Sequence, residues 1–212
     1  MQWSFSVLTF LVVFNTFGTT SVLAQSYHPC TPEQYFHDPS TSIPTTQELH
    51  GDFKIAYRSG DRKLALSILC QAAAAKSPEA EFMLGMVLAE GTLGVGKNDA
   101  QARYWYQRAV SQGHADAAFY YGKFYLEGRG GAVDSTKGIR MLRSAAEANL
   151  PKAQAWLAYQ YTTGVHIEQN LDQAIYWAER SYKLGHQSAK ELIEIIEDLI
   201  FKRDQRMFQK RR

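Results

Sequence analysis

The sequence has few cysteines and no large excess of charge of either sign. Two of its 212 residues are cysteine, and 23 basic against 21 acidic side chains leave a formal net charge of +2. General nucleic-acid binding is excluded, because such proteins gain affinity by neutralising many phosphates. The two cysteines, Cys30 and Cys70, are far from the C-x-x-C spacing of a redox-active dithiol, so redox chemistry is not predicted.

Charge is absent altogether from the first 24 residues. Val7 to Phe14 is almost wholly apolar, and Val22-Leu23-Ala24 precedes Gln25 with the −3 and −1 residues that a signal peptidase recognises. We therefore expect residues 1–24 to be a signal peptide and the mature protein to be periplasmic or secreted. An uncleaved membrane anchor is the alternative.

Three stretches of the remaining chain are copies of one another. They read PEAEFMLGMVLAEG from Pro78, ADAAFYYGKFYLEG from Ala115 and PKAQAWLAYQYTTG from Pro151. Their last residues lie 37 and then 36 positions apart and are Gly91, Gly128 and Gly164. A period of this length is typical of stacked helical hairpins, each too small to bury its apolar face without its neighbours.

Each copy predicts a first helix, a Gly-rich turn and a second helix. Apolar residues at i, i+4 and i+8 predict the buried line of each first helix. Its members are Ala80, Leu84 and Leu88, then Ala117, Tyr121 and Tyr125, then Ala153, Leu157 and Tyr161. One position is always small, which allows close approach of another backbone. It holds Gly85, Gly122 and Ala158.

These residues resemble the Sel1-like repeat, a relative of the tetratricopeptide repeat. The residues that carry the resemblance in register are a Leu-Gly or Tyr-Gly pair, an aromatic, a closing Gly and an Ala-rich second helix. They include Gly91, Ala102, Trp105, Tyr106 and Gly113; Tyr121, Gly122, Gly128 and Ala145; and Leu157, Tyr161, Gly164, Ala174, Trp177 and Gly185. The match covers about residues 61–186.

The resemblance implies an all-α, right-handed α/α solenoid of Sel1-like hairpins with capping helices. We expect six segments, in this order. They are a signal peptide (1–24), an irregular leader (25–44), an N-terminal cap and incomplete repeat (45–77), three repeats (78–186), a C-terminal capping helix (187–201) and a basic tail (202–212).

The leader carries Cys30, and the predicted helix of the incomplete repeat carries Cys70. An even pair of cysteines in an exported protein is more often a disulfide than two free thiols, so we expect a bridge that holds the leader to the first hairpin. Cys70 corresponds to Gln107 of the next repeat, which places it on the outer face of the helix.

No catalytic, cofactor or metal site is predicted. The string Gly91–Lys97 nearly spells a phosphate-binding loop, but Asn98 replaces the Ser or Thr that would bind Mg²⁺, and a helix precedes it instead of a strand. His114 and His186 occupy equivalent turns two repeats apart, too distant to share an ion. The pattern is that of an ordinary repeat turn.

A binding surface is predicted instead, on the inner, concave face of the first helices. Large side chains recur there about 100° or more from the buried line, and packing between repeats is the alternative role for them. They are Met83, Met86, Tyr120, Lys123, Trp156 and Tyr159. The strip suits a partner protein or peptide of the cell envelope. The basic tail from Lys202 suits an anionic lipid or acidic partner, or is a solvated, frayed end.

The resemblance leaves three functions open. The first is a protein-interaction adaptor, as in relatives that act in envelope biogenesis, signalling, motility and host interaction. The second is an enzyme, because a cysteine-rich branch of the family binds and hydrolyses β-lactams. That branch has a disulfide in each repeat, and residues 82–186 here contain no cysteine. The third is a structural subunit of an envelope machine such as a flagellar motor ring.

Overall fold

The computed structural model describes Cys30 and residues 46–210, and within them it consists of helices without any β-strand. The predicted all-α repeat solenoid is confirmed. The helices are α2 (Thr46–Ser59), α3 (Arg62–Ala74), α4 (Pro78–Glu90), α5 (Asp99–Ser111), α6 (Ala115–Glu127), α7 (Ser135–Glu147), α8 (Pro151–Thr163), α9 (Leu171–Lys183) and α10 (Ala189–Lys210).

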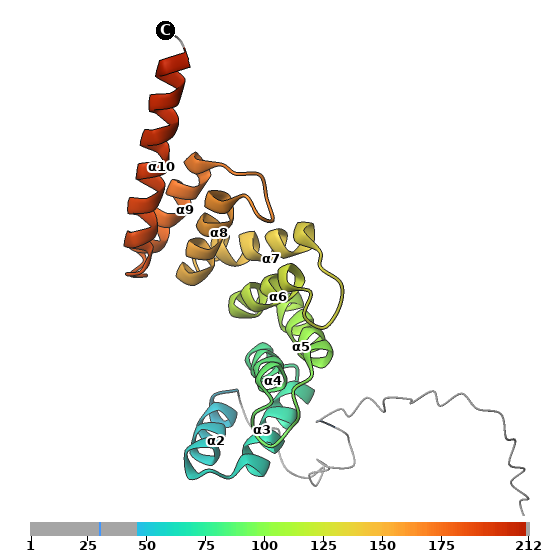
Figure 1. Cartoon of the computed structure of the whole chain (residues 1–212). Helices are drawn as coiled ribbons and strands as arrows, with labels where there is room; N and C mark the ends of the chain where they lie inside the picture. The colour runs from blue at the N-terminus through green and yellow to red at the C-terminus, as the bar shows by residue number, and fades with distance from the viewer. Residues whose placement is uncertain (1–29, 31–45, 211–212) are drawn as a thin grey trace, which may run out of the picture.

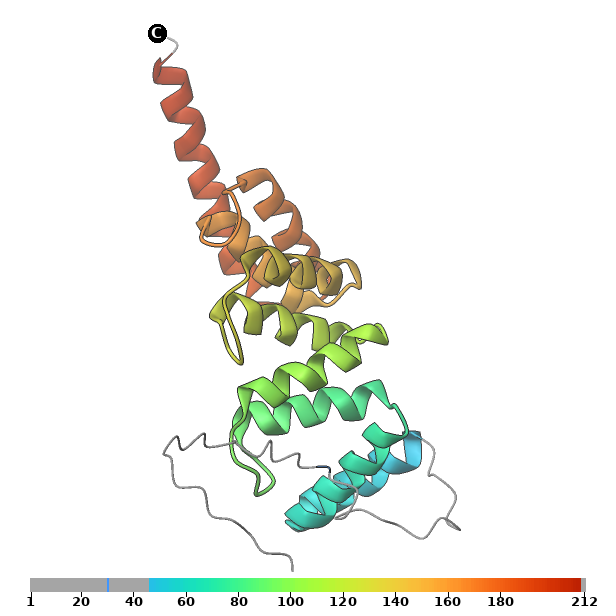
Figure 2. The ribbon, with the colours of Figure 1, turned by 90° about the vertical axis from the view of Figure 1, so that its right-hand side faces the viewer.

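The helices form one stack in chain order, with α2 at one end and α10 at the other (Figures 1 and 2). Each helix packs mainly on the helices before and after it in the sequence. The three repeats are the pairs α4–α5, α6–α7 and α8–α9, and α2–α3 precede them. The buried apolar side chains form two clusters, a first core from Ala56 on α2 to Phe124 on α6 and a second core from Ala118 on α6 to Ile196 on α10. The two cores are continuous, since Tyr120 and Val110 pack against both.

Helix boundaries follow from local side chains. The second helices begin at residues whose side-chain oxygen accepts a backbone N–H three residues on, which satisfies a donor that the first turn leaves unpaired. These residues are Asn98, Asp134 and Asn170. The first helices end at glycines with a left-handed backbone, which residues with a side chain adopt only at a cost. Their φ values are +72° at Gly91, +68° at Gly128 and +72° at Gly164.

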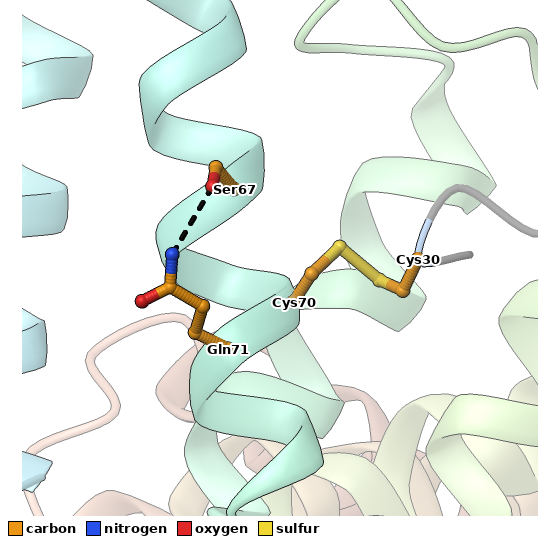
Figure 3. Close-up of a disulfide and its surroundings, with 4 residues drawn as sticks. All are labelled: Cys30, Ser67, Cys70 and Gln71. Carbon is orange, nitrogen blue, oxygen red and sulfur yellow. Dashed lines mark hydrogen bonds between the residues drawn. A yellow bond between two sulfur atoms is a disulfide. The ribbon is translucent and has the colours of Figure 1, made fainter. Parts of the chain in front are cut away.

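The structure joins Cys30 to Cys70, with 5.3 Å between their Cα atoms (Figure 3). The expectation that Cys70 lies on the outer face is wrong. Cys70 is only 4% exposed and belongs to the first core, whereas its equivalent Gln107 is exposed. The difference arises because Cys30 packs against the first core at Cys70.

The C-terminal helix is longer than predicted. We expected a cap ending at Phe201 and a basic tail beyond it, but α10 continues without a break to Lys210. Residues 201–210 contain neither Gly nor Pro, Lys202 pairs with Asp198 one turn earlier, and basic side chains favour the C-terminal end of a helix dipole. Residues 1–24, the other leader residues, Arg211 and Arg212 lie outside the described residues.

In the part of the chain that the structure describes, no helix combines the length and apolar character needed to cross a bilayer.

Candidate partner-binding surface

The six residues predicted as a binding surface, here called the aromatic strip, come from three first helices. Met83 and Met86 lie on α4, Tyr120 and Lys123 on α6, and Trp156 and Tyr159 on α8. Five of the side chains are half-buried, and only Tyr159 is exposed, at 50%. The strip is therefore partly core and partly surface.

Tyr120 is the member that contributes most to packing between repeats. Its ring centroid lies 5.6 Å from that of Phe82, 6.0 Å from that of Tyr106 and 5.2 Å from that of Phe119. Phe82 and Tyr106 belong to the first repeat and Tyr120 to the second, so the contact holds the two repeats together. This matches the packing alternative for Tyr120 rather than a role confined to the surface.

Trp156 and Tyr159 lie where the strip reaches solvent. The Trp156 ring meets the buried Phe119 edge-on at 6.3 Å, and the Tyr159 ring is 6.3 Å from Trp156. Trp156 packs against the second core with part of its surface, while Tyr159 packs against Trp156 and leaves half of its area to water. An aromatic side chain so placed offers a ligand a large, rigid contact area.

Two lysines lie over these rings. Lys123 Nζ is 5.2 Å from the Trp156 ring and 5.9 Å from Phe119. Lys152 Nζ is 4.9 Å from the Tyr120 ring and 5.3 Å from Phe119. Such distances allow an attraction between the ammonium group and the ring face. Lysine ammonium groups therefore lie over the faces of the aromatic rings in and beside the strip.

A carboxylate accompanies each lysine. Asp116 is 2.5 Å from Lys152, and Glu127 is 3.8 Å from Lys123. Both pairs are partly exposed, so their net contribution to stability is small. Phe119 and Lys152 were missed by the sequence reasoning. Phe119 repeats the position of Phe82, and that recurrence was the available signal.

A small hollow lies where α2, α3 and α4 meet, beside the first-repeat end of the strip. Its lining is mainly apolar and includes Met83, with the polar side chains of His50, Ser77 and Glu79 at its boundary. The Glu79 carboxylate is 2.9 Å from His114 Nε2, and this hydrogen bond holds the pKa of Glu79 below its usual value. The hollow therefore has a negative charge at its edge at neutral pH.

The matches to known proteins agree with this architecture. The sequence model of the Sel1 repeat matches three consecutive segments, residues 78–114, 115–150 and 151–186. The chain belongs to the Sel1 repeat family.

Two solved structures share the Sel1 fold of this chain. A Sel1 repeat protein from Oxalobacter formigenes superposes with a TM-score of 0.63 and 30% identity, over 69% of this chain and 60% of the other. The protective antigen c5321 of uropathogenic Escherichia coli, described as displaying an SLR fold, gives a TM-score of 0.60 and 26% identity, over 65% of this chain and 31% of the antigen.

Two curated relatives are named as regulators. Chitin synthase regulatory factor 4 of Schizosaccharomyces pombe is 28% identical over 66% of this chain and 22% of its own length. Chitin synthase regulator SKT5 of Saccharomyces cerevisiae is 28% identical over 57% of this chain and 18% of its own length. The Sel1 chain thus spans about a fifth of these relatives.

The histidines of the Sel1 turns have local roles. His114 precedes α6, where its Nδ1 accepts the backbone N–H of Ala117, and His186 contacts Ser188 at 3.0 Å. Nowhere in the described residues do three His, Cys, Asp or Glu side chains gather as a metal site would require. The loop of residues 91–97 serves as a turn, with Leu93 and Val95 buried.

One charged group of the Sel1 repeats was not anticipated. Glu81 on α4 is fully buried, and its carboxylate accepts hydrogen bonds from Arg108 Nε at 2.8 Å and from Gln112 Nε2 at 2.6 Å. Arg108 Nη2 adds a contact of 2.6 Å. The equivalent residues in the other repeats are Ala118 and Gln154, so the repeat pattern does not predict a buried carboxylate at this position.

Proposed function

We propose that this protein is a non-catalytic adaptor that binds a partner protein or peptide across the first helices of its repeats. Its family and the regulator names of its relatives support binding over catalysis. The observation that carries the location is the half-exposed ring of Tyr159 beside Trp156, with Lys123 over the Trp156 ring. Aromatic residues are enriched among those that dominate binding energy at interfaces.

The chemistry of the strip favours a peptide segment with both apolar and charged side chains. Trp156 and Tyr159 provide ring faces for an apolar group. Lys123 and Lys152 provide donors for a carboxylate, and Asp116 provides an acceptor for a cation. Each of these charged groups already forms an ion pair within the protein. A partner that brings both a carboxylate and a cation would replace these ion pairs by new ones and leave no charge unpaired.

The first test is site-specific photocrosslinking in intact cells. A photoreactive amino acid at position 159 should capture a discrete partner. The same amino acid at position 176 is the control, because Tyr176 lies on α9, outside the strip, and is 49% exposed against 50% for Tyr159. Equal crosslinking from both positions would contradict a binding site on the strip.

The second test separates binding from packing. Tyr159→Ala should weaken capture of that partner by about 30-fold, the equivalent of roughly 2 kcal/mol, and leave the melting temperature nearly unchanged. Tyr176→Ala should affect neither. Trp156→Ala should lower both affinity and stability, because Trp156 packs on the second core as well as on Tyr159. Unchanged capture by Tyr159→Ala would assign the strip to packing alone.

We also propose that the protein is exported and meets its partner in the cell envelope or outside the cell. The uncharged N-terminal segment and the paired cysteines support this. The mature protein should begin at Gln25, and it should migrate faster on electrophoresis without reductant than with it. A chain that retains Met1 in membranes, or two thiols that react with a maleimide in native protein, would overturn the proposal.

A further inference from the structure

The C-terminal half of α10 projects beyond the stack. The first half packs on α9 and α8, with Ala189 and Ile196 fully buried. From Phe201 to Lys210 every side chain is exposed, and this segment, here called the overhang, extends alone beyond the other helices (Figures 1 and 2). These ten residues are therefore helical although they belong to neither core.

The overhang is amphipathic. At 100° per residue, Met207 falls on the same side as Ile200 and Ile193, the residues that pack α10 onto the stack. Phe201 and Phe208 both lie about 100° to one side of that line. Phe201, Met207 and Phe208 are 63%, 54% and 59% exposed. The overhang thus has an exposed apolar face that is turned away from the side on which α10 packs.

The opposite side of the overhang is basic. Its cations are Lys202, Arg203, Arg206 and Lys210. Lys202 pairs with Asp198, and Arg203 contacts Asp172 and Asp204. Residues 205–212 contain four Lys or Arg and no Asp or Glu, so positive charge increases toward the projecting end.

We propose that the overhang is a peripheral membrane-binding helix that lies on an anionic lipid surface, separate from the aromatic strip. A helix with Lys or Arg on one face and large apolar residues on the other lies in the plane of the bilayer, with the apolar face in the headgroup–acyl boundary. The overhang has both faces, and it projects beyond the repeats (Figures 1 and 2). Two juxtaposed overhangs would bring like charges together, which disfavours a second copy as the occupant.

One residue limits the strength of this contact. Asp204 lies between Ile200 and Phe208 on the apolar side, where a carboxylate is costly to bring to an anionic surface. The contact is therefore reversible and sensitive to salt. Because the Asp204 carboxylate opposes binding, the Asp204→Asn variant should bind anionic vesicles more strongly than the natural protein.

The test is flotation of the full chain with phosphatidylcholine vesicles, with and without phosphatidylglycerol. All variants keep the same N-terminal segment, so differences between them report on the overhang. The natural chain should bind more to the anionic vesicles, and less as salt is raised. Arg206→Gln with Lys210→Gln should lower partitioning about 25-fold, which is about fivefold for each of the two cations removed.

Apolar variants test insertion. Phe201→Gln with Phe208→Gln should abolish anionic binding, whereas Ile195→Gln should not, although Ile195 is an equally exposed apolar residue of α10 on its other side. Circular dichroism should show that all variants keep their helices. Full binding by the Phe201/Phe208 variant would overturn the proposal in favour of a charge-only contact. If instead the natural chain forms dimers in the absence of lipid, and the same substitutions dissociate them, the overhang would be a contact with a second copy of this chain.

Discussion

One glycine or alanine in the first helix of each repeat allows that helix to lie close to the second helix. A Cβ atom added at Gly85 would lie 2.5 Å from the Tyr106 ring, and one at Gly122 would lie 2.9 Å from the Gly138 carbonyl oxygen and 3.0 Å from Leu142 Cγ. Tyr106 and Leu142 occupy the same repeat position, which in the third repeat is Ala178. The third repeat therefore accommodates Ala158 because its opposing residue is smaller, and both are fully buried.

Replacing glycine by alanine should have opposite effects at Gly122, which is closely packed, and at Gly51, which is not. Gly122→Ala should destabilise the protein by about 1–3 kcal/mol, because the backbone oxygen of Gly138 cannot move aside cheaply. Gly51→Ala in α2 should stabilise it by about 0.5–1 kcal/mol, since no atom lies within 4 Å of the new Cβ and alanine favours helix. Urea unfolding measures both. A stabilising Gly122→Ala would contradict the close packing.

A second residue-scale prediction concerns pH. Asp99 receives hydrogen bonds from Arg129 Nη2 at 2.6 Å and Nε at 3.2 Å, and this bidentate contact lowers the pKa of Asp99 below 3.8. A lowered folded pKa contributes stability that is complete above the unfolded value and lost as pH falls through the folded value. Asp99→Asn should therefore destabilise the protein at pH 7, and by less and less as acid protonates Asp99 in the folded natural protein. Denaturant midpoints measured from pH 7 downward test this, and a difference independent of pH would refute it.

At the scale of the helix pair, Glu81 and Arg108 tie α4 to α5. A buried carboxylate is tolerated only while it is paired, so removing one partner costs more than removing both. The second repeat has Ala118 and Ser144 at these two positions and forms the same hairpin. The pair is therefore not required by the repeat geometry itself.

A double-mutant cycle tests this. Arg108→Ser alone should cost about 3–5 kcal/mol, because Glu81 remains buried with only Gln112 as a partner. Glu81→Ala with Arg108→Ser, which copies the second repeat, should cost less than the single Arg108 variant. Free energies from urea unfolding give the coupling. Additive losses would mean that the pair acts only through packing.

At the scale of the whole molecule, the disulfide attaches the leader to the stack through a loop of 40 residues. Closing a loop of this length restricts the unfolded chain by about 4 kcal/mol in the chain-entropy description. Cys30→Ala with Cys70→Ala should lower stability by up to that amount and leave the helical signal of the repeats intact. Thermal melts followed by circular dichroism measure this effect. Loss of helix at 25 °C would show that the repeats also depend on the bridge.

The architecture could be predicted from the sequence because its causes are local and repeated. The 36- to 37-residue spacing, the glycines that end the helices and the small residues at one position each act within a hairpin or between adjacent hairpins. The bounds of the repeats, their order and their all-α stacking therefore follow from the chain alone, whereas the C-terminal end of α10 did not.

What the tertiary structure decided was which neighbour covers each side chain. Cys70 and Gln107 share a position, but only Cys70 is buried, because Cys30 lies over it. Tyr120 and Tyr159 were predicted as one strip, but Tyr120 packs between two repeats and Tyr159 faces water. On one side of α10, Ile196 is buried where α8 and α9 pack on the helix, whereas Met207, beyond them, is 54% exposed. Burial depends on residues distant in sequence, so periodicity identifies an apolar face but not whether another part of the protein covers it.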